Sequence, residues 1–344
     1  GVSGTFVALG SLAGPSVGGL IVSALRWEYI FWINIPVGIV VFLLSFRYLP
    51  LKEKTQKGRL DVPGAFLFLV FITALFVSLG QLESTGALDA GMLAVMGLSL
   101  IAFVAFIAIE RRAVSPLLDL TLFRNKWFSI SVFCGLISFL AVFCSNIVQP
   151  FYFQDVLGMD PGTAGLYMTI FPLVMGLVSP LSGYLSDRIG SGLLTVVGLL
   201  IMAVGLFGMS TLSETPSYLL MVAYIALSSL GNAIFQSPNN SLAMSTVPPD
   251  KLGIGGSVNA LIRNFGMVSG ISMATILLFG SMSAKVGYRV SGHIPGRGDV
   301  FVYGMRVVYI AAGLICLAGM LVTLLNLLRE RKLKIAGEAP PKER

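Results

Sequence analysis

Charged residues are scarce in this chain. Only 11% of its 344 residues are Asp, Glu, Lys or Arg, while 56% are hydrophobic and the mean hydropathy is +0.88. Soluble domains carry about 25% charged residues, so this chain lacks the polar atoms needed to cover a surface in water. The scarcity excludes a soluble globular protein and predicts an integral membrane protein.

Cysteine and histidine are also nearly missing. Cys134, Cys144 and Cys316 lie inside apolar segments without a CxxC or metal-ligand spacing, which predicts small buried side chains. His293 stands alone in a Gly-rich loop, and no Ser/His/Asp set or phosphate-binding loop is present. These absences disfavour an enzyme, and we expect no cofactor and no resident metal.

Long apolar runs are what the chain does have. A helix needs about 20 apolar residues to cross the hydrocarbon core of a bilayer. The segments that qualify predict an all-α bundle of about ten transmembrane helices: 1–24, 29–49, 61–80, 90–109, 127–153, 162–186, 191–212, 216–246, 252–279 and 303–328.

The basic residues predict the orientation of these helices. With alternating crossings, most Lys and Arg residues fall on the side of Gly1 and of the polar tail that starts at Arg329. The opposite side receives Arg26, Lys285, Arg289, Arg297 and Arg306. Since cytoplasmic loops carry the excess of Lys and Arg, we expect a cell-membrane protein with a cytoplasmic C-terminus. The net charge of +7 reflects this topology, and no nucleic-acid surface is indicated.

One stretch, 228–270, places polar side chains at membrane depth, where they are costly unless they face protein or a wet cavity. Asn232, Gln236 and the pair Asn239/Asn240 recur on one helix face. Asn259 and Arg263 lie one turn apart on the next segment, with Gly266 and Gly270 on the same side. Two such stripes facing each other predict the inside of a bundle that handles a polar or cationic molecule; the alternative is interhelical hydrogen bonding without a ligand.

Other polar and small residues extend this prediction. Gly10, Gly14 and Gly18 form a small-residue ridge beside Pro15 and Gly19, which lets another helix approach closely. Near the outer end of segment 127–153 lies a second polar and aromatic cluster with Asn146, Gln149 and Tyr152. After segment 162–186, Asp187 is placed to cap the following helix or to pair with a base, and Arg188 to anchor at the cytoplasmic face.

These motifs together resemble the major facilitator superfamily, and within it the fourteen-helix drug:proton antiporter branch. The first segment matches that family's antiporter motif G-x-x-x-G-P-x-x-G-G, and FWINIPVG (31–38) is typical of the helix that follows. GYLSDRIG (183–190) is similar to the second copy of the family's loop motif, and SPNNS (237–241) and the Arg263 helix are similar to its late helices.

The resemblance implies a domain plan. Residues 1–49 would be the last two helices of an N-terminal bundle, 50–126 a linker with two extra helices, 127–328 a C-terminal six-helix bundle and 329–344 a cytoplasmic tail. The first four helices of the family would be missing, and with them its usual proton-coupling residues. In agreement, Asp61, Glu110, Asp155 and Asp187 all fall near predicted helix ends.

The resemblance also implies a function: proton-driven export of amphipathic, often cationic, compounds by alternating access. The residues expected to line the cavity are Asn146, Gln149, Tyr152, Tyr167, Phe171, Asn232, Gln236, Asn239 and Asn240, with Met168 and Met175 as adaptable apolar contacts. The residues expected to act in conformational change are Gly10, Gly14, Pro15, Gly18, Gly19, Asp187, Arg188 and Arg263.

Two other hypotheses stay open. The same fold serves carriers of one defined metabolite, peptide or lipid, because fold does not fix substrate. A chain lacking the first helices would also be unable to transport by itself. The partners expected in either transport case are a small-molecule substrate, protons and the lipid bilayer, and the sequence leaves an accessory export protein open.

Overall fold

The computed structural model describes residues 18, 21, 26, 28–48, 61–86, 89–113 and 116–335. Regular structure in these ranges is helical, which confirms the predicted all-α class. The long helices are α3 (Asn34–Tyr48), α4 (Val62–Thr85), α5 (Ala90–Glu110), α6 (Lys126–Phe151), α8 (Ile170–Ile189), α9 (Ser191–Ser210), α10 (Tyr218–Ser245), α11 (Leu252–Val286) and α12 (Gly298–Ile335). The short elements are α2 (Tyr29–Trp32), η1 (Leu120–Arg124), η2 (Tyr152–Val156), α7 (Pro161–Met168) and η3 (Pro249–Lys251).

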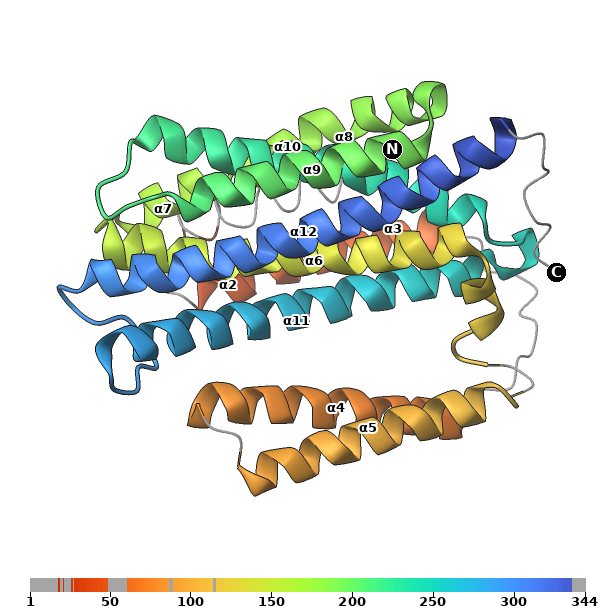
Figure 1. The fold of residues 1–344 in the computed structure, drawn as a ribbon, viewed down its shortest axis with the longest axis horizontal. Coiled ribbons are helices and arrows are strands. Elements are labelled where there is room, and N and C mark those ends of the chain that lie inside the picture. The colour runs from red at the N-terminus through yellow and green to blue at the C-terminus, as the bar shows by residue number, and fades with distance from the viewer. Residues whose placement is uncertain are drawn as a thin grey trace.

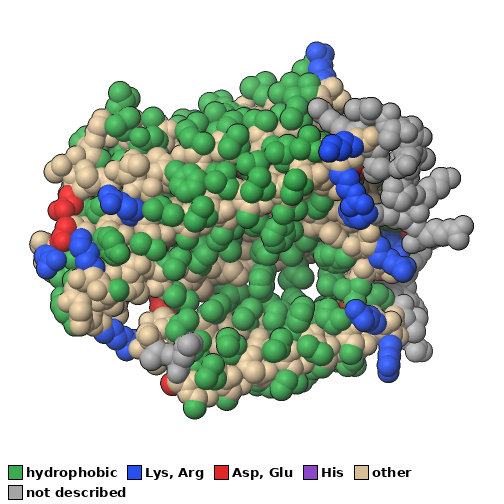
Figure 2. Space-filling view, in the orientation of Figure 1, with side chains coloured by type: hydrophobic (Ala, Val, Ile, Leu, Met, Phe, Trp, Pro, Cys, Tyr) green, Lys and Arg blue, Asp and Glu red, His purple; other side chains and the backbone are tan. Residues whose placement is uncertain are grey.

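Within the described residues, nine segments are long and apolar enough to cross a membrane. They coincide with nine of the segments predicted from hydropathy. The other predicted segment, 1–24, lies almost entirely outside the described residues. Figure 2 shows the corresponding surface: apolar side chains cover the middle of the face, and Lys and Arg side chains gather toward its two ends.

Short polar side chains fix where several helices begin. Asp89 Oδ1 accepts a hydrogen bond from the backbone N–H of Met92 at 2.6 Å, and Asp160 Oδ1 accepts one from Gly162 at 3.0 Å. Asn125 caps α6 in the same way through the N–H of Trp127. Such caps satisfy the orphan donors of the first helical turn, so the aspartates near helix ends are explained by helix geometry.

The helix ends differ from the hydropathy prediction in two places. α11 continues to Val286 and stops at Gly287, whose φ of +80° suits a glycine C-cap. α12 begins at Gly298 and continues to Ile335, so the chain stays helical into the predicted tail. The loop between them is therefore 287–297, shorter than the 281–302 predicted, because the helices extend beyond their apolar stretches.

The predicted single helix 162–186 is interrupted. It consists of α7 and α8, with Thr169 between them. Pro172 has no N–H to donate to the carbonyl of Met168, so the backbone ladder is broken at this point. Asp187 lies inside α8 and is exposed, while the N-cap position of α9 is taken by Gly190, with φ +94° and no side-chain cap. The expectation that Asp187 caps the following helix is therefore wrong.

The six-helix part 126–335 forms two layers (Figure 1). α6 packs against α10 and α11, and α10 also packs against α8, so α8, α10, α6 and α11 form one layer. α9 and α12 contact each other and cover one side of that layer, α9 on α10 and α12 on α6 and α11. The opposite side of the four-helix layer is not covered by α9 and α12, so half-buried polar side chains can lie there.

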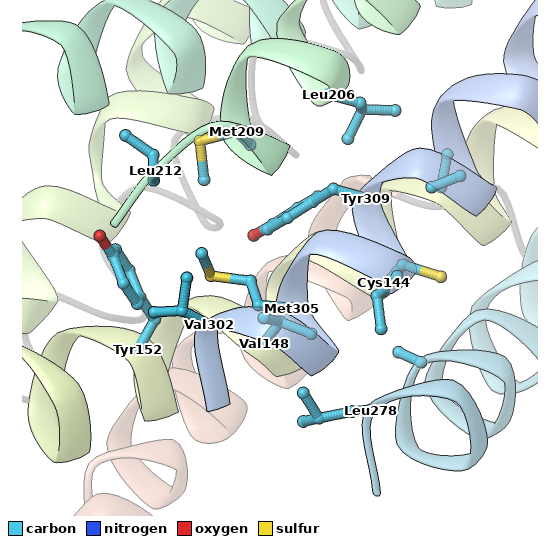
Figure 3. Close-up of a cluster of buried hydrophobic side chains, with 14 of the residues drawn as sticks. Cys144, Val148, Tyr152, Leu206, Met209, Leu212, Leu278, Val302, Met305 and Tyr309 are labelled. Carbon is cyan, nitrogen blue, oxygen red and sulfur yellow. The ribbon is translucent and has the colours of Figure 1, made fainter. Parts of the chain in front are cut away.

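The largest buried cluster lies between α6, α9, α11 and α12. Tyr309 and Met305 of α12 meet Met209 of α9 and Cys144 of α6, all of them without solvent exposure (Figure 3). Cys134 and Cys316 are buried as well, and all three thiols are free. The sequence prediction of small buried cysteines is confirmed.

Helices α4 and α5 form a separate pair beside α11 (Figure 1). They pack on one another through aromatic rings, with Phe71 and Phe103 at a centroid distance of 4.8 Å, and Ser99 donates to the Phe71 carbonyl at 3.1 Å. Their contact with the bundle includes Phe76 against Phe265 of α11 at 5.9 Å. The pair thus touches the bundle along one helix.

Candidate functional site

A polar seam runs along the contact between α6 and α10. Asn239 Nδ2 donates to the backbone carbonyl of Ser131 at 3.0 Å, and Ser138 Oγ donates to Asn232 Oδ1 at 2.8 Å. The two serines are seven residues apart, as are the two asparagines, so antiparallel helices bring them together pairwise. All four side chains are nearly inaccessible to solvent.

The seam includes α8. Asn232 Nδ2 lies 3.3 Å from the Met175 sulfur, a weak acceptor on α8. Ser182, also on α8, donates to the Ile234 carbonyl of α10 at 2.9 Å. The expectation that Asn232 and Met175 share a site is consistent with this geometry, in which three helices meet at one asparagine.

Two polar atoms of the seam have no hydrogen-bond partner among the described residues. They are Ser131 Oγ and Asn239 Oδ1, and both are buried. Each leaves a desolvation cost of about 1–3 kcal/mol unless something pairs with it. Asn239 also lies 3.5 Å from the position that a Cβ on Gly135 would occupy, so the glycine lets the amide approach α6 closely.

A second polar group lies where α10 meets α11. Asn259 Nδ2 donates to Asn240 Oδ1 at 2.6 Å, which joins the two stripes predicted from the sequence. Gln236 is half-buried one turn before Asn240, and Arg263 is exposed one turn after Asn259. We call these four residues the amide–arginine group. Arg263 is its only charged member.

Gly266 and Gly270 on α11 have a role different from the predicted one. A Cβ on Gly266 would lie 2.9 Å from the Leu136 carbonyl of α6, and one on Gly270 would collide with the Leu140 carbonyl. These glycines therefore bring α11 against α6, whereas the prediction placed them opposite the α10 stripe. Their role is close packing of helices.

Several predicted cavity residues lie away from both polar groups. Tyr152 is fully buried in the core and donates from its hydroxyl to the Ser213 carbonyl at 2.6 Å (Figure 3). Gln149 is buried and donates to Ser145 Oγ at 3.0 Å, while Asn146 is half-buried on α6. The outer cluster is thus largely engaged in internal hydrogen bonds.

The aromatic residues predicted to line the cavity come from the region where α7 and α8 meet. Tyr167 stacks on Tyr218 with ring centroids 6.3 Å apart and also contacts Phe153. Phe171 is half-buried, and its carbonyl accepts from Ser229 Oγ at 2.6 Å. This hydrogen bond ties α10 to the first turn of α8, next to the α7–α8 break.

The residues predicted to act in conformational change are only partly within the described ranges. Gly10, Gly14, Pro15 and Gly19 lie outside them. Gly18 is half-buried, and a Cβ there would meet nothing within 4 Å. Arg188 is exposed, and its guanidinium lies 4.6 Å from the centre of the Tyr184 ring, a cation–π contact.

Sequence reasoning missed the serines of α6. Ser131, Ser138 and Ser145 repeat every seven residues along one face, and each is buried. A heptad repeat of hydroxyls within an apolar segment is a detectable signal, since it marks a face turned toward protein and away from lipid. It would have identified the seam from α6 as well as from α10.

Acidic side chains are nearly absent from the helices that form the site. Helices α6, α10 and α11 contain no Asp or Glu, and the one in α8 is Asp187 in its last turn. Arg263 is the charged residue of these helices that lies well away from a helix end. Among the described residues no group of three His, Cys, Asp or Glu side chains could hold a metal ion.

The described part of the chain has nine helices long and apolar enough to cross a membrane, with a buried polar seam between helices that are otherwise apolar, and this is the design of a multi-pass membrane transporter. The chain belongs to the Major Facilitator Superfamily, whose family description matches residues 1–271 and 131–343. This confirms the resemblance to the superfamily and the transporter class, and the protein is not an enzyme. The fourteen-helix drug:proton antiporter branch stays a prediction.

Characterised and uncharacterised relatives are similar along most of this chain. The riboflavin transporter RibZ of Clostridioides difficile is 30% identical over 94% of this chain and 68% of its own length. The uncharacterized transporter YebQ of Escherichia coli is 34% identical over 81% and 61%. The multidrug transporter protein MdtP of Bacillus subtilis is 30% identical over 79% and 51%. The chain thus spans about half to two thirds of the length of these relatives.

Proposed function

We propose that the protein exports amphipathic compounds, cationic ones included, in exchange for protons, as a multidrug efflux transporter of the fourteen-helix branch. Transport would proceed by alternating access, with the two helix bundles of the family rocking about a central site. The multidrug transporter named above supports this proposal by similarity. The described residues would supply the C-terminal side of such a site.

The observation that carries the proposal is the pair of unpartnered buried atoms, Ser131 Oγ and Asn239 Oδ1. If these residues served only to join the helices, we would expect both atoms to have hydrogen-bond partners, because unpaired polar groups are costly at membrane depth. A polar group of a substrate, or a water that the substrate displaces, would supply the missing hydrogen bonds. Gln236, Asn240 and Arg263 would then contact the substrate from the same side of the four-helix layer.

The orientation and the domain plan are part of the proposal. We place the basic ends of α8, α5 and α12 in the cytoplasm of a cell-membrane protein, following the excess of Lys and Arg there. Residues 127–328 would be the moving C-terminal bundle, and 50–126 with α4 and α5 a linker at its edge. The contacts between this helix pair and the bundle are made mainly by α4 on α11, which supports this division.

A transport assay on the full-length protein in proteoliposomes tests the site. An imposed proton gradient should drive movement of a fluorescent lipophilic cation, and Asn239→Leu should lower the rate at least about tenfold by removing a hydrogen-bonding group from the seam. Asn326→Leu, the same substitution on α12 away from the seam, should leave the rate near that of the native protein. Equal rates for native protein and Asn239→Leu would refute the site assignment.

A second candidate is a carrier of one defined solute. Similarity to a riboflavin transporter over 68% of that protein supports it, and the lack of acidic residues on α6, α10 and α11 suits a neutral or anionic solute as well as a cation. Competition separates the two candidates. Several unrelated cations should each inhibit a multidrug exporter, whereas riboflavin alone should inhibit a carrier specific for it.

A further inference from the structure

Two carboxyl groups meet where the helix pair α4/α5 joins the rest of the chain. Asp61 caps α4, with its Oδ1 accepting from the Gly64 N–H at 2.9 Å. Glu110 is the last residue of α5, only 3% exposed, and its Oε1 accepts from the backbone N–H of Leu118 in the following loop. One oxygen of each carboxyl group is thus used to fix backbone.

The other two oxygens, Asp61 Oδ2 and Glu110 Oε2, are buried and receive no hydrogen bond from an N–H or O–H donor of the described residues. They lie close together, because the position that a Cβ on Gly64 would take is in contact with both of them. The position that a Cβ on Gly64 would take collides with Asp61 Oδ2 and lies 2.9 Å from Glu110 Oε2. The glycine leaves room for the two carboxyl groups to meet.

A hydrogen bond between two carboxyl groups requires a proton that one of them carries. Two carboxylates in one buried place repel each other, and the arrangement is stable when they hold one proton between them. A cation could neutralise the pair instead, so the neighbouring charges matter. Arg111 and Arg112 follow Glu110 and are exposed, and Asp119 of the loop is paired with Lys251 at 2.6 Å. Lys57 and Arg59 precede Asp61 and lie outside the described residues.

We propose that Asp61 and Glu110 form a proton-binding site, in which a proton carried by Glu110 joins the start of α4, the end of α5 and the loop that leads to α6. The site is separate from the seam and does not depend on the transported substrate. Losing the proton leaves two facing negative charges, which push Glu110 away from Asp61 and loosen its hold on Leu118. The folded protein holds this proton at pH values where the unfolded chain has already lost it. The attachment therefore weakens as the pH rises.

Hydrogen–deuterium exchange at the Leu118 amide measures the attachment directly. With the full-length protein in lipid nanodiscs, corrected for intrinsic exchange rates, protection of this amide should fall by up to tenfold per pH unit as the pH rises and Glu110 loses its proton. Glu110→Gln keeps the acceptor for Leu118 and offers Asp61 a permanently neutral donor. Its protection should be high and independent of pH.

Glu83→Gln, an exposed substitution at the far end of α4, is the matched control and should follow the native profile. Asp61→Asn should also abolish the pH dependence, which keeps the test available if Glu110→Gln fails to fold. A native profile without pH dependence would overturn the proposal. Loss of protection in Glu110→Gln at every pH would do so too, because it would show that a base from the segment before Asp61 neutralises the pair.

Discussion

Gly231 on α10 lies against the backbone of α9. A Cβ at this position would lie 2.7 Å from the Gly198 carbonyl and would collide with the Met202 N–H group. Backbone atoms cannot move aside as a flexible side chain can, so we expect Gly231→Ala to destabilise the bundle by about 1–3 kcal/mol. Thermal unfolding in detergent, followed by intrinsic fluorescence, should show a lower midpoint.

Gly256→Ala is the matched control. Gly256 lies inside α11, and a Cβ there meets nothing within 4 Å. Since alanine favours a helix over glycine by about 1 kcal/mol, this variant should be as stable as the native protein or more so. Equal losses in both variants would mean that contact between α9 and α10 does not decide the effect.

The sequence predicted part of the site and missed its partners for a specific reason. Asn232 and Asn239 stand out because an amide in an apolar segment is unusual, and the structure does bring both to one seam. Ser131 and Ser138 are common residues in such segments and give no signal singly. Tyr152 is an aromatic residue with a polar hydroxyl, the kind of side chain expected to line a cavity. Its hydroxyl nevertheless donates to a backbone carbonyl inside the core, which no local pattern reveals.

The loop before α6 is tied to the start of α11 by one ion pair. Lys251 Nζ lies 2.6 Å from Asp119 Oδ2, and Asp119 Oδ1 accepts from the Thr121 N–H at 2.9 Å. Burial alone would raise the pKa of Asp119, but hydrogen bonds from Lys251 and Thr121 outweigh it and lower the pKa below its usual 3.8. The pair therefore stabilises the fold above that pH and loses its effect as the carboxylate is protonated.

We expect Asp119→Asn to lower the unfolding midpoint at neutral pH. The difference from the native protein should stay constant above about pH 5 and shrink as the pH falls below about 4, because the unfolded chain then binds a proton at this carboxyl more readily than the folded protein does. Asp155→Asn, at an exposed position, serves as control and should change little. A midpoint difference that grows toward acid pH would contradict the assigned role of the pair.

Helix existence was predictable here, and helix ends were less so. Hydropathy located nine segments correctly because each must be apolar for the width of a bilayer. It could not show that α11 runs on to Val286 or α12 to Ile335, since a helix continues past the hydrocarbon core as long as its backbone bonds are satisfied. The break at Thr169 has a visible signal in the sequence, Pro172, because a proline inside a helix cannot donate to the carbonyl four residues before it.

The arrangement of the whole chain in the membrane yields a topology test. All three native cysteines are buried, so a membrane-impermeant maleimide should leave the native protein unlabelled in intact cells. Single cysteines can then be introduced at exposed serines without removing the native ones. Ser291 lies in the loop between α11 and α12, and Ser245 at the end of α10, both exposed.

If the excess of Lys and Arg marks the cytoplasmic side, Ser291→Cys should be labelled in intact cells and Ser245→Cys only after permeabilisation. The substitution is the same at both places, so a difference in labelling reports sidedness and not chemistry. The reverse pattern would place the basic helix ends outside and would invert the proposed direction of export. Labelling of both in intact cells would also contradict the proposed sidedness, because an outward-open transporter is closed at its cytoplasmic end, where Ser245 is placed.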